Sequence, residues 1–246
     1  MTFNTDQCVV MTVTNKKNPA VYDYTLNNTV LSRKEVIKYL GLFIDNKLTF
    51  KYHIEQKCQS ATRVLNLLRR NLYFAPKSVK NKAYFSCVLP IIEYGSNCWS
   101  PSSDKMNNKI EMVQHSAAKF ACNSYPRRGR YEEFSITRLL ESLQWESVEH
   151  RRNKAKLNMA YKILNGDVIL SADLLPRPQR PLRSCNSGSA GAENQLLEPH
   201  ARIKTVENTF FYQVPKLWNR IVTRPQATAP SIEAFKNHFK PRRTGG

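Results

Sequence analysis

The stretch KLTFKYHIEQKCQSATRVLNLLRRNL, residues 47–72, carries the clearest periodic pattern of the chain. Its apolar side chains recur at alternating steps of four and three residues, at Ile54, Cys58, Ala61, Leu65, Leu68 and Leu72. Its opposite side holds Gln59, Arg63, Asn66 and Arg70. This spacing predicts a helix that buries one face and offers a basic, hydrogen-bonding face to another molecule.

The residues before this stretch favour strands. Three runs rich in β-branched and aromatic residues, 8–14, 20–25 and 36–44, are separated by turn-forming segments. Such runs between turn residues are typical of β-structure. We therefore expect a small antiparallel sheet over residues 1–46.

Downstream of residue 72 the pattern is helical. Pro76 and Pro90 each suit a first helical turn, where no N–H is needed, so two short helices are expected at 77–89 and 91–99. A further apolar stripe predicts a helix over 104–122.

Capping residues mark the remaining helices. Ser135 and Ser147 are candidate N-caps for helices at 136–143 and 148–164, and Gly166 is a candidate stop for the second. Ser102 or Ser103 is a candidate N-cap for the helix at 104–122. Ser231 is a candidate N-cap for a last short helix that ends near Phe239.

Residues 176–195 are rich in Pro, Gly and Ser with almost nothing to bury, so we expect a flexible linker there and a core that ends before it. The aromatic segment 210–221 beyond it is expected to dock back on the body. The predicted fold is therefore α+β. It comprises the N-terminal antiparallel sheet (1–46), a mainly α-helical bundle (47–175), the linker (176–195), and a partly disordered aromatic and basic tail (196–246).

Charge narrows the class of partner. The chain carries a formal net charge of +19, of which +11 lies in residues 47–130 and +8 in residues 176–246. Neutralising phosphates and releasing their counterions supplies most of the nonspecific affinity of proteins for nucleic acids. The charge pattern therefore favours a nucleic-acid partner, although it identifies no activity.

The chain offers no self-contained catalytic site. Nucleotidyl transfer by two metal ions needs neighbouring carboxylates, but the six aspartates never adjoin; they are Asp6, Asp23, Asp45, Asp104, Asp167 and Asp173. Asp23 in particular is expected to be a solvent-facing carboxylate. The five histidines form no recognisable triad, and the six cysteines contain no C-x-x-C pair. We expect no catalytic residue, no metal ligand and no cofactor in this chain.

No run of about 20 apolar residues is present, and the longest candidate, 84–94, is interrupted by Pro90. We therefore expect a soluble intracellular protein with no membrane partner. The sequence leaves nucleus and cytoplasm open.

Basic and aromatic residues combine at helical spacing after residue 46. The candidate phosphate contacts of the first predicted helix are Lys47, Lys51, Lys57, Arg63, Arg69 and Arg70. Those of the second are Lys77, Lys80 and Lys82. Tyr52 and Tyr73 are placed to lie against sugars or bases. The alternative is an ordinary solvated helix face with long basic side chains.

Several ordered strings resemble reverse transcriptases of non-LTR (LINE) retrotransposons of the jockey and chicken-repeat kind. They are Asn4–Cys8, Lys38-Tyr-Leu-Gly-Leu-Phe-Ile-Asp45, Leu67–Leu72, Leu89-Pro-Ile-Ile-Glu-Tyr94, Trp99-Ser-Pro101, Trp145–Arg152, Tyr161–Gly166, Leu217-Trp-Asn-Arg-Ile221 and Ser231–Lys236. The likeness covers nearly the whole chain, and the order and spacing of the strings make it more specific than any one of them.

The resemblance implies a position within such an enzyme. Residues 1–46 would be the end of the palm, with Tyr39, Leu40 and Gly41 in the hairpin that supports the primer end. Residues 47–175 would be the thumb and a connection. The metal-binding aspartates and their Mg²⁺ would belong to a part of the palm upstream of this chain. Family members usually carry Lys where this chain has Gln7. If that Lys assists proton or phosphate handling during nucleotide addition, Gln7 would impair even a restored enzyme.

The expected function is therefore that of a reverse-transcriptase fragment which is not an enzyme on its own and which contacts an RNA–DNA or DNA duplex without sequence preference. The missing palm domain is a further expected partner. Two alternatives stay open: an inert relic of the element, and a helical protein-interaction module marked by a large exposed apolar patch.

Overall fold

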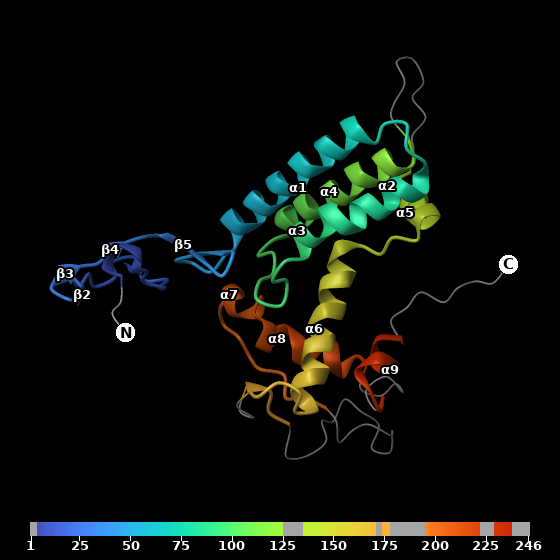
Figure 1. Cartoon of the computed structure of the whole chain (residues 1–246). Helices are drawn as coiled ribbons and strands as arrows, with labels where there is room; N and C mark the ends of the chain where they lie inside the picture. The colour runs from blue at the N-terminus through green and yellow to red at the C-terminus, as the bar shows by residue number, and fades with distance from the viewer. Residues whose placement is uncertain (1–3, 125–134, 171–173, 178–194, 222–228, 238–246) are drawn as a thin grey trace. The chain divides into compact units, whose positions relative to one another are not determined.

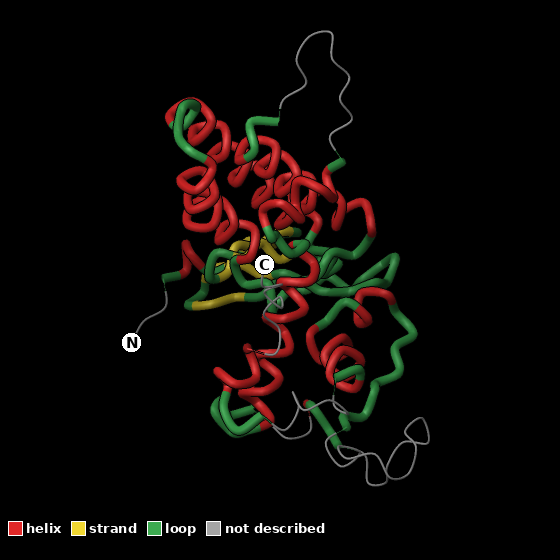
Figure 2. The backbone as a smooth tube through the Cα atoms, turned by 90° about the vertical axis from the view of Figure 1, so that its right-hand side faces the viewer, coloured by secondary structure: helices red, strands yellow, loops and turns green. Residues whose placement is uncertain are grey.

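The computed structural model describes residues 4–124, 135–170, 174–177, 195–221 and 229–237. The chain forms two compact units, one of residues 1–94 and 101–139 and the other of residues 95–100 and 140–246. Helices (red in Figure 2) make up most of the described chain, and strands (yellow) are confined to short stretches, so the α+β class is confirmed. Residues 178–194 of the predicted linker (176–195) and the end of the basic tail at 238–246 lie outside the described residues.

The first unit begins with short pairs of strands instead of one sheet (Figure 1). After the 3₁₀ turn η1 (Thr5–Gln7), β1 (Val9–Val10) pairs in parallel with β4 (Ser32–Arg33), and β2 (Thr25–Leu26) pairs antiparallel with β3 (Thr29–Val30). The long strands expected at 8–14 and 20–25 are thus wrong. Asn27 and Asn28, both with positive φ, make the turn between β2 and β3.

A third pair is a hairpin inside the run that was expected to be one strand at 36–44. Strand β5 (Val36–Tyr39) pairs antiparallel with β6 (Leu42–Asp45), with Tyr39 opposite Leu42. The turn between them consists of Leu40 and Gly41, with φ of 45° and 81°. Two positive φ angles are what a tight two-residue hairpin requires. The hairpin implied by the resemblance is therefore present at the predicted place.

Helix α1 (Lys51–Asn71) follows the hairpin and buries four members of the predicted apolar row, Ile54, Cys58, Ala61 and Leu65. Leu68 and Leu72 are only half-buried, and Leu72 lies just past the end of the helix. It starts four residues later than expected because Leu48 and Phe50 have positive φ and the carboxylate of Asp45 binds the backbone there. Asp45 accepts from the N–H groups of Lys47, Thr49 and Phe50 at 3.1, 3.0 and 2.7 Å, and from the Thr49 hydroxyl at 3.0 Å. One carboxylate therefore caps the loop that leads into α1.

The two short helices expected around Pro90 form one continuous helical stretch. It consists of α2 (Lys77–Ala83), the π-helical turn η2 (Tyr84–Val88) and α3 (Leu89–Glu93). Pro90 cannot donate to the preceding turn, and the wider π-turn accommodates that lost hydrogen bond. The second helix was expected to reach residue 99 but ends at Glu93.

Helix α4 (Asp104–Ala121) completes the helical part of the first unit, where it packs against α1 and α2 (Figure 1). Ser103 stands at its N-cap position, but its side chain makes no capping hydrogen bond. The core between these helices is built from one face of each; its members include Ile54, Ala61, Leu65, Tyr84, Val88, Ile92, Ile110, Ala117 and Phe120.

Helix α5 (Ile136–Leu143) spans the division between the units, and α6 (Val148–Leu164) is the long helix of the second. Both have the predicted bounds. The Ser147 hydroxyl accepts from the His150 N–H at 3.1 Å, and Gly166 takes a φ of 79° just after the helix, so the predicted cap and stop are confirmed.

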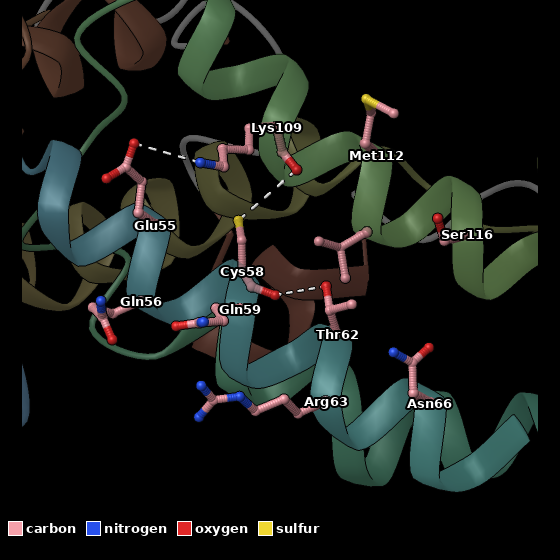
Figure 3. A pocket seen from close by; sticks show the side chains of 11 residues that line it. Glu55, Gln56, Cys58, Gln59, Thr62, Arg63, Asn66, Lys109, Met112 and Ser116 are labelled. Carbon is pink, nitrogen blue, oxygen red and sulfur yellow. Dashed lines mark hydrogen bonds and ion pairs between the residues drawn. The ribbon is translucent and has the colours of Figure 1, made fainter. Parts of the chain in front are cut away.

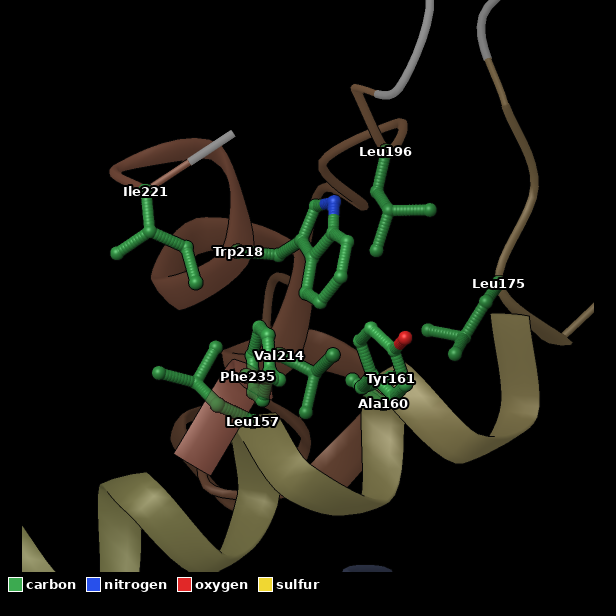
Figure 4. Close-up of a cluster of buried hydrophobic side chains, with 9 residues drawn as sticks. All are labelled: Leu157, Ala160, Tyr161, Leu175, Leu196, Val214, Trp218, Ile221 and Phe235. Atoms are coloured by element: carbon green, nitrogen blue, oxygen red, sulfur yellow. The ribbon is translucent and has the colours of Figure 1, made fainter. Parts of the chain in front are cut away.

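The core of the second unit continues past the predicted linker, contrary to expectation. Helices α8 (Phe210–Asn219) and α9 (Ile232–Asn237) pack against α6, and the short α7 (Lys204–Glu207) precedes them. Figure 4 shows the shared cluster: Leu157, Ala160, Tyr161, Leu175, Leu196, Val214, Trp218, Ile221 and Phe235. The expected docking of segment 210–221 is confirmed, and Ser231 caps α9 by accepting from the Ala234 N–H.

A buried lysine ties segment 95–100 into the second unit. The ammonium of Lys156 donates to the Ser100 hydroxyl at 2.6 Å and to the Gln213 side-chain oxygen at 2.5 Å. Burial, and then the charge of Arg152, lowers the pKa of Lys156 to about 8. One side chain therefore joins the loop, α6 and α8.

A buried histidine joins the hairpin to α1 and predicts a pH dependence of stability. The Phe43 N–H donates to His53 Nδ1 at 3.2 Å, and burial, followed by the charge of Lys57, lowers the pKa of His53 from 6.5 to about 4. Protons therefore bind the unfolded chain more readily than the folded one, and stability that is complete above pH 6.5 is lost as the pH falls towards 4. We expect a loss of about 2 kcal/mol, measured by urea unfolding.

The variant His53→Asn is the control, because its amide oxygen still accepts from Phe43 but does not titrate. Its unfolding free energy should change less with pH over the same interval. Equal slopes for the two proteins would show that His53 is not the group responsible.

Candidate nucleic-acid interface

The exposed face of α1 and the adjoining face of α4 border a groove of about 850 Å³ (Figure 3). Gln59, Thr62, Arg63 and Asn66 line it from α1, and all four are exposed. Lys109, Met112 and Ser116 line it from α4. The face predicted to meet another molecule is thus one wall of a groove between two helices.

The groove has a fixed floor. The Thr62 hydroxyl donates to the Cys58 carbonyl at 2.8 Å, and the Cys58 thiol lies 3.8 Å from the Lys109 carbonyl oxygen (Figure 3). Glu55 pairs with Lys109 at 3.4 Å, so the negative charge at this end is offset within the groove. Arg63 projects from the α1 wall. The arrangement offers amide, hydroxyl and guanidinium groups along about two helical turns, which suits a ligand with repeated acceptors.

The sequence indicated the α1 wall but not the α4 wall. The signal on α4 is the row Lys105, Lys109, Met112 and Ser116, whose steps of four, three and four put them on one side of that helix. Reading this row as part of a site requires knowing that α4 packs beside α1, which is a long-range contact.

Three lysines of the predicted set, Lys47, Lys51 and Lys57, have different surroundings. Lys47 is exposed, and its ammonium donates to the Thr14 carbonyl at 2.7 Å. Lys51 is exposed at the first position of α1. The ammonium of Lys57 lies 4.6 Å from the centre of the Tyr94 ring, and burial, followed by the charge of Lys38, lowers its pKa.

The turn of the β5–β6 hairpin is held against the end of α3. The Tyr94 hydroxyl donates to the Leu40 carbonyl at 2.8 Å, and a Cβ on Gly41 would lie 3.1 Å from the Tyr94 ring. Tyr39 and Leu40 remain 61% and 75% exposed. The predicted primer-end residues therefore form a turn that is anchored through its backbone and presents its side chains to solvent.

Two of the side chains that were predicted to contact phosphates bind other groups of the chain instead. Lys80 is buried; its ammonium donates to the Tyr73 carbonyl at 2.9 Å and to the Asn123 side chain, and it lies over the Phe120 ring. Arg69 is half-buried and donates to the Ser116 carbonyl at 2.9 Å and to the Asn66 side chain. We therefore correct the assignment of Lys80, and Arg69 acts first as a cross-link between α1 and α4.

The remaining members of the predicted set are exposed. Arg70 lies in the last turn of α1, and Lys77 and Lys82 lie on α2. Arg63 therefore lines the groove, whereas Arg70, Lys77 and Lys82 are exposed basic residues outside it. Tyr52 and Tyr73, predicted to meet sugars or bases, are 43% and 62% exposed.

Two searches of the described residues gave negative results. They contain no group of three or more His, Cys, Asp or Glu side chains arranged to hold a metal ion. Among the same residues no helix is both long enough and apolar enough to cross a membrane.

Comparison with known proteins identifies similar polymerases. The probable RNA-directed DNA polymerase from transposon BS of Drosophila melanogaster is 26% identical over 170 residues, which cover 68% of this chain and 18% of that protein. The RNA-directed DNA polymerase from mobile element jockey of the same species is 30% identical over 118 residues, 45% of this chain and 12% of that protein. An uncharacterised protein of Caenorhabditis elegans is 29% identical over 128 residues, 52% of this chain and 63% of that protein.

This chain is therefore related to the RNA-directed DNA polymerases of retrotransposons, as the resemblance in its sequence predicted. It spans less than a fifth of the two polymerases it matches. No family model matches the chain, and no solved structure matches it.

Proposed function

We propose that this chain is the end of the palm, the thumb and the tail of a non-LTR retrotransposon reverse transcriptase, and that it holds a template–primer duplex without catalysing nucleotide addition. The observation that carries the proposal is the groove between α1 and α4, whose α1 wall is the exposed row Gln59, Thr62, Arg63 and Asn66. The relation to RNA-directed DNA polymerases supplies the class of ligand.

The chemistry of the groove suits the backbone of a duplex. Arg63 supplies a guanidinium that can pair with a phosphate, while amides and hydroxyls can bond to sugars and to phosphate oxygens. Such contacts fix the position of a duplex without reading its sequence. The exposed Arg70, Lys77 and Lys82 add long-range attraction. The expected binding is therefore nonspecific and weakens with salt.

Asp45 has a structural role in the loop before α1. Both oxygens of Asp45 are occupied by donors from the loop before α1. Asp23 is exposed in the segment that precedes β2, as expected. In the proposal, the metal-binding carboxylates and their Mg²⁺ belong to another part of the polymerase.

The hairpin fits the same proposal. Its backbone is anchored by Tyr94, so the exposed Tyr39 and Leu40 have a defined direction. A turn held in this way can support the end of a primer strand without contributing to the reaction.

The proposal predicts the effect of removing two α1 arginines. The double variant Arg63→Ala, Arg70→Ala should bind a labelled RNA–DNA hybrid about tenfold more weakly than the parent chain, because two phosphate contacts are lost. Fluorescence anisotropy over a series of salt concentrations gives the slope of log affinity against log salt, which should become shallower by about 2.

The matched control is Arg177→Ala, Arg202→Ala, which removes the same charge from exposed positions in the second unit. If the control and the α1 double variant weaken binding equally, net charge alone explains the affinity and the groove has no special role. Binding that does not change with salt would contradict the proposal for the whole chain.

A second candidate, docking of another protein domain, is favoured by the N-terminal strands. Val13, Val21, Tyr22 and Tyr24 are between 50% and 70% exposed there, which is unusual for large apolar side chains near strands. An apolar contact of this kind would persist at salt concentrations that abolish duplex binding. The two candidates are compatible, because they use different parts of the first unit.

A further inference from the structure

A second pocket, of about 390 Å³, lies beside the hairpin and away from the α1–α4 groove. It is bordered by β1, by both hairpin strands and by the first turn of α1. Its polar and aromatic lining comes from Gln7, Lys34, Lys38, Phe43 and Tyr52. None of the side chains that line it in the described part of the chain is acidic.

The two lysines are held at the pocket by neighbouring structure. The Lys34 N–H donates to the Val10 carbonyl at 2.9 Å, which fixes this residue at the end of the β1–β4 pair. The ammonium of Lys38 lies 5.7 Å from the centre of the Phe43 ring. Both residues are exposed and line the same pocket, so their ammonium groups can approach one anion.

Aromatic rings form the adjoining wall. Phe43 and Tyr52 meet edge to face, with ring centres 5.1 Å apart. Phe43 therefore supports both the Lys38 ammonium and the Tyr52 ring. Tyr52 is still 43% exposed, so part of it is accessible to a planar group, and base–tyrosine stacking is a common way to hold an unpaired base.

A third cation adds to the local positive field. Lys57 lies close enough to Lys38 for the charge of Lys38 to lower its pKa. Like charges that are held together repel each other, and a bound anion relieves that repulsion. The neighbouring positive charges therefore favour the binding of an anionic group in this pocket.

We propose that this pocket binds a nucleoside phosphate, with the phosphate between Lys34 and Lys38 and the base against Tyr52. The side-chain amide of Gln7 lines the same pocket and can donate to and accept from a base edge. The volume lies within the range of about 300–1,000 Å³ that is typical of small-molecule sites. The ligand is either a free mononucleotide or an unpaired nucleotide of a strand. The inference rests on the proposed function only for its class of ligand.

The test titrates the full chain with adenosine monophosphate, adenosine, inorganic phosphate and a short single-stranded DNA, measured by isothermal calorimetry. Adenosine monophosphate or the oligonucleotide should bind more tightly than either adenosine or phosphate. The variant Lys34→Ala, Lys38→Ala should weaken that binding about tenfold, since both phosphate contacts are lost. The matched control Lys16→Ala, Lys17→Ala removes the same charge from exposed residues outside the pocket and should change it less than about twofold.

The tyrosine is tested separately. Tyr52→Leu should remove most of the advantage of adenosine monophosphate over phosphate, about tenfold by the usual strength of stacking, whereas Tyr52→Phe should retain it. The Phe variant keeps the ring packing on Phe43. A folding defect in the Leu variant would weaken phosphate binding as well, so unchanged phosphate binding assigns the loss to the base.

Several results would overturn the inference. Phosphate binding as tightly as adenosine monophosphate would remove the base from the proposal, and equal losses in the pocket and control variants would remove the pocket. A preference for the oligonucleotide over the mononucleotide would identify the source as a strand. Duplex binding through Arg63 and Arg70 is measured independently, so failure of the pocket leaves that result standing, and the reverse also holds.

Discussion

Replacing Asp45 with alanine is expected to lower the unfolding free energy of the first unit by about 3 kcal/mol, because hydrogen bonds to a carboxylate are worth roughly 1.5–3 kcal/mol each and several are lost together. The Asp45 carboxylate receives three backbone N–H groups and one hydroxyl. The loop that it organises contains two residues with positive φ, Leu48 and Phe50, and this strained backbone needs such support.

The measurement is urea unfolding followed by far-UV circular dichroism. Asp45→Asn should lose about half as much stability, because its amide keeps one acceptor oxygen but presents N–H groups to the remaining donors. Asp23→Ala is the control, because Asp23 is exposed on the same unit, and its effect should stay within about 0.5 kcal/mol. If Asp23→Ala and Asp45→Ala are equally stable, the loop is held by other contacts and Asp45 is not its cap.

Tryptophan fluorescence provides an internal check on that result. All three tryptophans, Trp99, Trp145 and Trp218, lie in the second unit. A loss of stability caused by Asp45→Ala should therefore appear in circular dichroism and leave the fluorescence transition nearly unchanged. A shift of the fluorescence midpoint of similar size would show that the two units unfold together.

Helices with a regular apolar period were predictable because their signal is local. The bounds of α5 and α6 agree with the prediction, and α4 differs by one residue. The Ser147 cap and the Gly166 stop depend only on neighbouring backbone, so the sequence is sufficient to identify them. The same holds for the buried and exposed rows of α1.

Features decided by distant contacts were missed by the residue pattern along the chain, although the family resemblance implied the hairpin. The hairpin within 36–44 turns at Leu40, a residue with little preference for positive φ, and the contact that supports this turn comes from Tyr94, 54 residues away. Lys80 looks like a surface lysine in its own helix, yet it is buried because Asn123, 43 residues away, accepts its hydrogen bond. Neither partner can be identified from spacing along the chain.

The candidate site also combines a feature that is predictable from local sequence with one that depends on distant contacts. The polar row of α1 was predictable from the helical period, whereas the groove was not, because it exists only where α4 lies beside α1. The pocket beside the hairpin is even harder to predict from the sequence than the groove. It joins Gln7, Lys34 and Tyr52 from three separate segments of the chain, so no spacing rule connects them.

The composition of residues 176–195 led to the expectation that the core ends before them, and the contacts of Phe235 contradict it most directly. The Phe235 side chain is wholly buried, its ring stacks with Trp218 at 6.0 Å between centres, and it lies 4.7 Å from the Tyr161 ring. A composition rich in Pro, Gly and Ser bears only on the residues of that segment. The segments on either side of it can still share one hydrophobic core. Leu175 and Leu196, which flank the linker closely, are both buried in the same cluster.

Phe235→Ala should therefore lower the unfolding free energy of the second unit by about 4 kcal/mol, the usual cost of removing a buried phenylalanine. Trp218 lies beside the cavity that the substitution creates, so tryptophan fluorescence during urea unfolding reports the change directly. Lys236→Ala, at the exposed neighbouring position of α9, should change the unfolding free energy by less than about 0.5 kcal/mol. If Phe235→Ala has no greater effect than Lys236→Ala, α9 contributes nothing to the core in solution. A large loss would mean that residues 229–237 belong to the core of the second unit, and that cutting the chain at its linker would destabilise that unit.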